Sequence, residues 1–138
     1  MERSVKPQAA FLSAFVSFVL LISSVMLLWR SNLLLLIVML VECVTALVLW
    51  HERIDVSFFL VIAVFGTMAE LAFVRVGVWQ YANLTLLGIP LWFPLAFGTT
   101  GLIGGRLARA ITDLWDRKRP VRPMGGVKVA HDAAVYDK

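Results

Sequence analysis

Charged residues and cysteines are scarce in this chain. Of its 138 residues, 16% are charged and 60% are hydrophobic, whereas a soluble domain is typically about 25% charged and about 45–50% apolar. The composition therefore excludes an ordinary soluble domain. The single cysteine, Cys43, cannot form an internal disulfide or a zinc site. Since it lies within an apolar run, we expect it to act as a small buried hydrophobic residue.

Motifs that bind metals, nucleotides or cofactors are also missing from the sequence. The two histidines, His51 and His131, stand far apart, so a haem held between two transmembrane histidines is not expected. We expect neither a metal nor a cofactor. The net charge of +4 comes from basic residues near the ends of the chain and of its apolar runs. This distribution is typical of membrane proteins, and no nucleic-acid partner is expected.

Four apolar runs make up most of the chain and predict helices over residues 9–29, 33–50, 56–79 and 86–119. Each apolar run, the fourth ending at about Gly105, has about the 20 residues that an α-helix needs to cross a hydrocarbon core about 30 Å thick. The pattern predicts an all-α, four-helix transmembrane bundle that forms one unit over residues 1–119. The first run is too long for a cleaved signal peptide, so we expect a retained anchor.

Two features mark the ends of these runs. Tryptophan favours membrane boundaries, and it occurs near the run ends as Trp29, Trp50, Trp79, Trp92 and Trp115. Proline is tolerated in the first turn of a helix, where we place Pro90, and bends a helix further along, where we place Pro94.

The distribution of Lys and Arg predicts the orientation of the bundle. One side would hold Arg3, Lys6, Arg53 and the basic residues from Arg106 to Lys128, and the other side Arg30 and Arg75. Loops rich in Lys and Arg stay in the cytoplasm. Both termini are therefore predicted to be cytoplasmic, with the protein in a prokaryotic inner membrane.

The fourth helix is predicted to continue past the membrane as an amphipathic, interfacial helix that ends at Pro120. Its basic residues would face anionic lipids at the inner surface. These membrane-surface residues are Arg106, Arg109, Arg117, Lys118 and Arg119. Residues 120–138 are expected to form a flexible cytoplasmic tail.

Small residues form stripes along three of the predicted helices. The stripes are Gly98, Gly101 and Gly105 on the fourth helix, Ala63, Gly66 and Thr67 on the third, and Ser13, Ser17 and Ser24 on the first. Gly101 and Gly105 form a GxxxG pair, which permits close backbone approach. We expect the stripes to pack against one another inside the bundle, although the same contacts would also serve a homo-oligomer or a partner protein.

Two glutamates lie inside apolar runs, Glu42 near the bilayer middle and Glu70 in the outer half of the third helix. An acidic side chain at a helix centre costs about 2.5–3.5 kcal/mol on insertion, so such residues face the bundle interior and are candidates for function. A functional glutamate would bind a proton or anchor a ligand. A structural one would hydrogen-bond to Thr45, Thr67 or a serine of the first helix.

The outer end of the third helix offers further candidates for a ligand site. Arg75, Trp79, Tyr81 and Trp92 would line an outward-facing pocket beneath the link at residues 80–87. The alternative is an ordinary aromatic belt with one arginine that extends to the membrane surface.

The segment from Glu70 to Pro94 carries a resemblance to known membrane proteins. It reads Glu-x6-Gly-x-Trp-x-Tyr and then Leu-Gly-Ile-Pro-Leu-Trp-Phe-Pro. It resembles a segment of small uncharacterised prokaryotic multi-helix membrane proteins and is, more distantly, similar to one in membrane carotenoid hydratases. The resemblance implies one site and an isoprenoid-type substrate. The site would contain Glu70, Gly77, Trp79, Tyr81, Gly88, Pro90 and Trp92.

Three functional classes remain open. The first is a non-enzymatic subunit or accessory protein of a membrane complex, or a lipid-binding protein. The second is a small proton-coupled transporter that uses Glu70 or Glu42; it would resemble small multidrug exporters, except that their essential glutamate lies in the first helix. The third is an isoprenoid- or lipid-modifying enzyme with Glu70 as acid or base. We expect a non-enzymatic role ahead of an enzymatic one.

Overall fold

The computed structural model describes residues 7–82 and 87–118 and is all-helical. Its helices are α1 (Pro7–Leu28), α2 (Asn32–Leu49), α3 (Arg53–Arg75) and α4 (Phe93–Lys118). The all-α fold class predicted from the sequence is confirmed. Three helices, α1, α2 and α3, are long and apolar enough to cross a membrane. The predicted tail at residues 120–138 and Arg119 lie outside the described residues.

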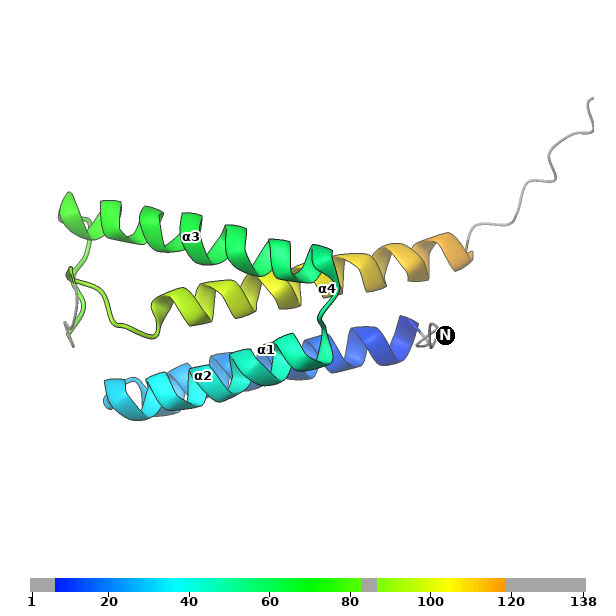
Figure 1. Ribbon diagram of the computed structural model, residues 1–138, viewed down its shortest axis with the longest axis horizontal. Coiled ribbons are helices and arrows are strands. Elements are labelled where there is room, and N and C mark those ends of the chain that lie inside the picture. Colours follow the sequence, from blue (N-terminus) through cyan, green and yellow to red (C-terminus); the bar gives the residue numbers. More distant parts are fainter. Residues whose placement is uncertain (1–6, 83–86, 119–138) are drawn as a thin grey trace, which may run out of the picture.

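The four helices run up and down, with α4 between α3 and the α1–α2 pair (Figure 1). Helix α4 packs against each of the other three, and α1 also packs against α2. Figure 1 shows that the start of α1 and the end of α4 lie at the same end of the molecule, which we call the terminal end. The opposite end, which carries the turn between α1 and α2 and the link between α3 and α4, is the distal end.

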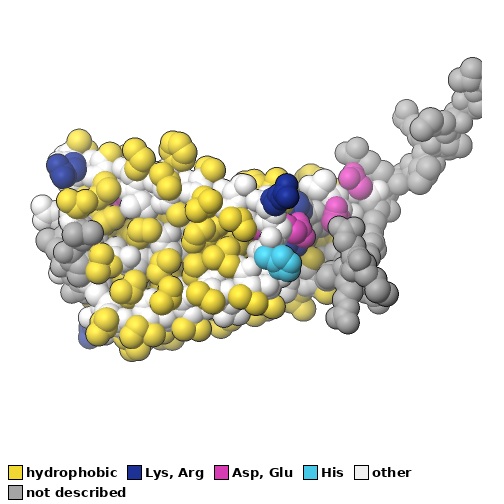
Figure 2. Space-filling view, in the orientation of Figure 1, with side chains coloured by type: hydrophobic (Ala, Val, Ile, Leu, Met, Phe, Trp, Pro, Cys, Tyr) yellow, Lys and Arg dark blue, Asp and Glu magenta, His cyan; other side chains and the backbone are white. Residues whose placement is uncertain are grey.

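Helix α4 is the least apolar of the four helices, and it is the central one. Helices α1, α2 and α3 expose apolar side chains over their outer faces, for example Leu27, Leu33 and Phe65, which are 79%, 71% and 66% exposed. Figure 2 shows hydrophobic side chains over the middle of the molecule and charged ones gathered towards its ends. The middle of the molecule therefore presents an apolar surface.

Glycines bring α4 close to α3. A Cβ added at Gly101 would lie 2.6 Å from Cβ of Ile62 and 2.8 Å from the backbone oxygen of Phe58, and Gly98 and Gly105 lie against Phe59 and Phe58. A Cβ added at Gly104 would meet nothing within 4 Å. The glycine stripe of α4 is thus occupied within the chain by α3.

The serine stripe of α1 crosses to another helix at one position. Ser13 and Ser17 donate to backbone oxygens of their own helix, while Ser24 donates to a side chain of α2. Around them, the buried apolar core joins α1, α2 and α4 through residues Ala14, Leu21, Leu35, Met39, Trp92 and Ile103. Cys43 is buried on α2.

Helix α3 ends at Arg75, four residues before the predicted end at Trp79. Gly77 has a φ of +77°, the N–H of Val78 donates to Phe73 O, and the N–H of Gly77 donates to Val74 O. These two bonds form a Schellman motif, in which a residue with positive φ reverses the chain after the helix. The prediction of a longer helix was wrong because apolarity continues past this glycine.

Helix α4 begins at Phe93, not at residue 86 as predicted. Pro90 lies before the helix, and Pro94 occupies its first turn, where the missing N–H costs no hydrogen bond. The predicted roles of both prolines were therefore wrong by one turn. Gly88, with a φ of +91°, and Pro90 lie in the non-helical residues 87–92 that precede the helix.

The predicted continuation of the fourth helix is present, but it does not turn away from the other helices. Residues from Arg106 onward extend α4 in line with its first part (Figure 1). The reason is visible in the contacts of this segment, because Arg106 and Arg109 are both paired with Asp55 of α3.

Candidate functional site

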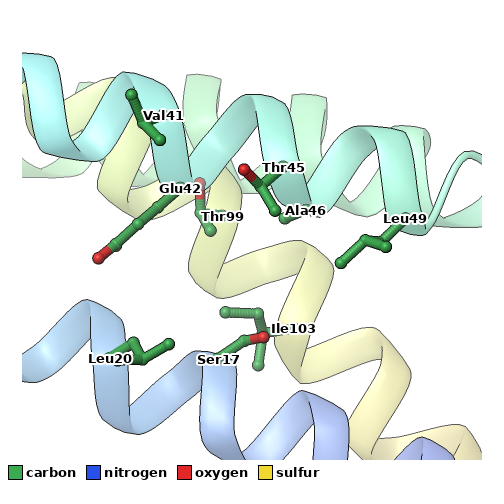
Figure 3. Close-up of a pocket in the computed structure, with 9 residues that line it drawn as sticks. All are labelled: Ser17, Leu20, Val41, Glu42, Thr45, Ala46, Leu49, Thr99 and Ile103. Carbon is green, nitrogen blue, oxygen red and sulfur yellow. The ribbon is translucent and has the colours of Figure 1, made fainter.

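Glu42 lies near the middle of α2, about 15 Å from its first residue at the usual rise per residue. Side chains of a helix lean towards its N-terminus, and Figure 3 shows Glu42 extending from α2 towards α1 in that direction. There Ser24 Oγ donates a hydrogen bond of 2.6 Å to Glu42 Oε1. The other oxygen, Oε2, is buried and has no hydrogen-bond partner.

Glu42 also lines a cavity between α1, α2 and α4 with a volume of about 250 Å³ (Figure 3). The lining residues are Ser17, Leu20, Val41, Glu42, Thr45, Ala46, Leu49, Thr99 and Ile103. Three of them, Leu20, Val41 and Leu49, are 56%, 61% and 63% exposed. The cavity therefore opens through the side of the molecule, between α1 and α2.

The cavity has an acidic group and no basic one among the described residues. No Lys, Arg or His lines it. In residues 7–82 and 87–118, Arg106 pairs with Glu52 and Asp55, and Arg109 pairs with Asp55, so that none of these ion pairs includes Glu42. An unpaired carboxylate is costly to bury. The arrangement can therefore bind a proton or a cationic, hydrogen-bond-donating group.

Glu70 has a different environment, at the distal end of α3. Its side chain is buried, and its Oε1 accepts hydrogen bonds from Trp79 Nε1 at 2.7 Å and from the hydroxyl of Tyr81. Burial, followed by the hydrogen bond to Glu70, raises the pKa of Tyr81 to about 12. Glu70 thus fastens the segment after α3 onto the helix that precedes it.

The Schellman turn explains how both donors reach one carboxylate. Because the chain reverses at Gly77, Trp79 and Tyr81 come back alongside α3. The ring of Trp79 lies 5.1 Å from that of Phe73, and the ring of Tyr81 lies 4.9 Å from that of Phe93. These contacts tie the link to α3 on one side and to α4 on the other.

The remaining candidates at the distal end are divided between two environments. Arg75 is exposed and makes no ion pair with Glu70 in the described part of the chain. Trp92 is buried, stacks on Phe93 at 4.5 Å and donates to Asn32 Oδ1 at 3.3 Å. Tyr81 and Trp92 line a second cavity of about 200 Å³, together with Val25, Trp29, Asn32, Ala82 and Pro90.

The structure joins some of the predicted site residues and separates others. Glu70, Trp79 and Tyr81 form one contact group, whereas Glu42 lies in a different cavity. The partner of Glu42 is a serine of the first helix, as the structural alternative proposed; the partners of Glu70 are aromatic donors and not Thr67.

Comparisons with protein-family models, curated proteins and solved structures give no match.

One buried ionic group was not predicted from the sequence. Asp55 in the first turn of α3 is fully buried and pairs with Arg106 and Arg109 of α4, and Arg106 also contacts Glu52 at 3.0 Å. The membrane-surface role predicted for these two arginines stays a prediction, but each already has a protein partner. The sequence does contain a signal for this contact. Asp55 directly precedes the third apolar run and Arg106 directly follows the fourth, and in an up-and-down bundle these two positions lie at the same end.

Proposed function

We propose that this protein is a small integral membrane protein that crosses the bilayer four times, with α4 as the shielded fourth span. The outer faces of α1, α2 and α3 are apolar, and the charged side chains gather towards the ends of the molecule. Helix α4 is the least apolar of the four but packs against the other three, so that Gly98, Thr99, Gly101 and Gly105 are buried within the chain. This supports four spans in place of three.

The charges favour a cytoplasmic terminal end. The terminal end carries Arg53, Arg106, Arg109, Arg117 and Lys118, and the distal end carries Arg30 and Arg75. The positive-inside rule then puts both termini in the cytoplasm. In a Cys43→Ser background, an impermeant thiol reagent added outside intact cells should label Ser31→Cys and Gln80→Cys but not His51→Cys, all three positions being exposed. Labelling of His51→Cys would contradict this orientation.

For the activity, we propose non-enzymatic binding of a lipid-like molecule in the cavity at Glu42. The observation that carries this proposal is the lateral opening of the cavity, which in a bilayer faces the acyl chains. Its apolar lining suits a hydrocarbon body, and Glu42 supplies one polar contact.

A second candidate, a proton-coupled transporter, is better served by Glu42 than by Glu70. One oxygen of Glu42 has no partner, whereas Glu70 already accepts bonds from Trp79 and Tyr81. The same occupancy makes Glu70 a poorer acid or base for an isoprenoid-modifying enzyme. A transporter would show substrate flux into proteoliposomes that a proton gradient drives and that Glu42→Gln abolishes.

The test of ligand binding is purification in a mild detergent followed by native mass spectrometry. Ser17→Leu should fill the cavity without removing a bond between helices, because the Ser17 hydroxyl donates to Ser13 O in its own helix. Ser13→Leu is the matched control, one turn away, exposed and outside the lining. We expect a lipid-like adduct on the wild type and the control and none on Ser17→Leu.

Two other results would redirect the proposal. An adduct that survives Ser17→Leu would place the ligand elsewhere on the protein. A stable protein partner, retained by all three forms, would favour an accessory subunit of a membrane complex, for which the apolar outer faces would supply the contact surface.

A further inference from the structure

Glu42, which lines the cavity, carries a carboxylate oxygen that the protein leaves without a donor. Ser24 satisfies Oε1, and Oε2 is buried without a partner. Proteins normally pair buried polar atoms, and an exception beside a cavity is explained by a group that binds there. A ligand that brings both a positive charge and N–H donors would satisfy the oxygen and neutralise the carboxylate together.

The other lining residues define the rest of the ligand. Leu20, Val41, Ala46, Leu49 and Ile103 form apolar walls, and the hydroxyl groups of Ser17, Thr45 and Thr99 are small. The cavity volume of about 250 Å³ is well above the roughly 30 Å³ that one water occupies in the liquid. The space therefore suits a polar head with a hydrocarbon body attached.

We propose that Glu42 binds the amino group of a lipophilic amine, which enters from the bilayer between α1 and α2. This inference rests on the proposed function and names the ligand class of the same cavity. In the complex the ammonium donates to the carboxylate of Glu42, and the alkyl chain lies along the apolar walls.

The proton balance is simple. A neutral amine takes its proton from the protonated carboxyl group of Glu42. An ammonium ion pairs directly with an ionised Glu42, or displaces the proton of a neutral Glu42 carboxyl group into water. Each route yields the same ammonium–carboxylate pair, and no other bond forms or breaks. A divalent metal ion is a poorer occupant, because the residues that the structure describes bring together no group of three His, Cys, Asp or Glu side chains.

The test compares octylamine with octanol, which has the same chain length but no positive charge at neutral pH. Thermal unfolding is followed for the purified protein in nanodiscs of neutral lipid at matched concentrations of each compound. A ligand that binds only the folded state raises the melting temperature. We expect octylamine to raise it by about 5 °C near saturation and octanol by much less.

Three variants assign the effect to the cavity. Glu42→Gln keeps an acceptor for Ser24 but lacks the charge, and should lose the difference between the two compounds. Asp113→Asn removes an exposed carboxylate of α4 and should keep that difference. Ser17→Leu should abolish both shifts, and it serves as a second variant if Glu42→Gln fails to fold.

Each other outcome overturns the inference. Equal shifts with octylamine and octanol, both lost in Ser17→Leu, would mean that the cavity binds alkyl chains without using charge; the proposed function would stand without the amine. An amine-specific shift that persists in Glu42→Gln would place the ammonium at another site. No shift with either compound would reject both the amine and the cavity as a ligand site.

Discussion

The two sides of α4 differ in how they meet their neighbours. Towards α3, glycines allow direct backbone approach, and each end of α3 is fixed by a buried carboxylate: Asp55 with two arginines and Glu70 with two aromatic donors. Towards α1 and α2, a cavity remains at mid-height, and Glu42 keeps one oxygen without a partner.

This difference separates a structural carboxylate from a candidate binding carboxylate. Asp55 fixes α3 against α4, and Glu70 fastens the segment after α3 onto that helix. Glu42 has a single partner and adjoins open space. Removing a partnered carboxylate should therefore destabilise the protein, whereas removing Glu42 should change binding and leave stability nearly constant.

The largest loss of stability should come from the glycine contact with α3. Gly101→Leu must push α3 away, since even its Cβ would approach Ile62 and the backbone of Phe58 within 2.8 Å. We expect about 3 kcal/mol of destabilisation, measured by thermal or denaturant unfolding in detergent. Gly104→Leu, at an open position on the same helix, should cost far less. Equal losses at Gly101 and Gly104 would show that the two helices do not meet at this face.

A somewhat smaller loss is expected at the terminal end of α3. Asp55→Asn leaves Arg106 and Arg109 without their carboxylate, although both arginines are partly exposed and can recover some hydration. We expect about 2–3 kcal/mol of destabilisation, below the range for a fully buried pair. Asp113→Asn, at an exposed position of α4, is the control and should be nearly neutral. If the two variants have the same stability, the ionic group does not fix α3.

Glu42 and Glu70 provide the most direct test of the comparison. Glu70→Leu deprives Trp79 and Tyr81 of their shared acceptor and should cost about 2 kcal/mol, while Glu70→Gln keeps an acceptor and should cost less than 1. Glu42→Leu removes an unpartnered oxygen, and Ser24 can then donate to its own helix as Ser23 does to Val19 O. We expect its unfolding free energy to change by less than about 0.5 kcal/mol. A greater loss for Glu42→Leu than for Glu70→Leu would reverse the assignment of the two residues.

The last prediction concerns the ionisation of Tyr81. Its pKa is raised to about 12 by burial and then by Glu70, against about 10 for an unperturbed tyrosine. The folded state therefore favours the neutral phenol, and the stabilisation is complete below pH 10 and lost as the pH rises from about 10 to 12.

An ultraviolet absorbance titration measures this shift. In a Tyr136→Phe background, Tyr81 is the remaining tyrosine of the sequence. It should ionise near pH 12, and at a lower pH when Glu70→Gln removes the negative charge beside it. Ionisation near 10 in both proteins would contradict the contact with Glu70.

The positions of α1 and α2 could be predicted within two residues because hydropathy changes sharply at Arg30–Asn32 and at His51. The end of α3 and the start of α4 could not, since Val76, Val78 and Leu87 continue the apolar pattern through a link whose shape depends on backbone angles at Gly77 and Gly88. Hydropathy reports the solvent around a segment and not its backbone conformation.

The candidate site was partly predictable for a related reason. An acidic side chain inside a long apolar run is costly to insert into a membrane, and this cost identified Glu42 and Glu70 as candidates from the sequence. Their partners depend on how helices and turns are placed: Trp79 reaches Glu70 only because α3 ends early, and Asp55 meets arginines 51 and 54 positions later in the chain. Such distant pairings require knowledge of which helices are neighbours.

The central place of α4 has a consequence for how the protein is made. Helix α4 leaves the ribosome after α1, α2 and α3, yet it is the one on which α3 and the α1–α2 pair both pack. A nascent chain that ends before Phe93 lacks these contacts, so α3 cannot take its final position before α4 has been synthesised. Assembly is therefore completed after translation of α4, when Arg106 and Arg109 arrive beside the Asp55 carboxylate that is already at the terminal end.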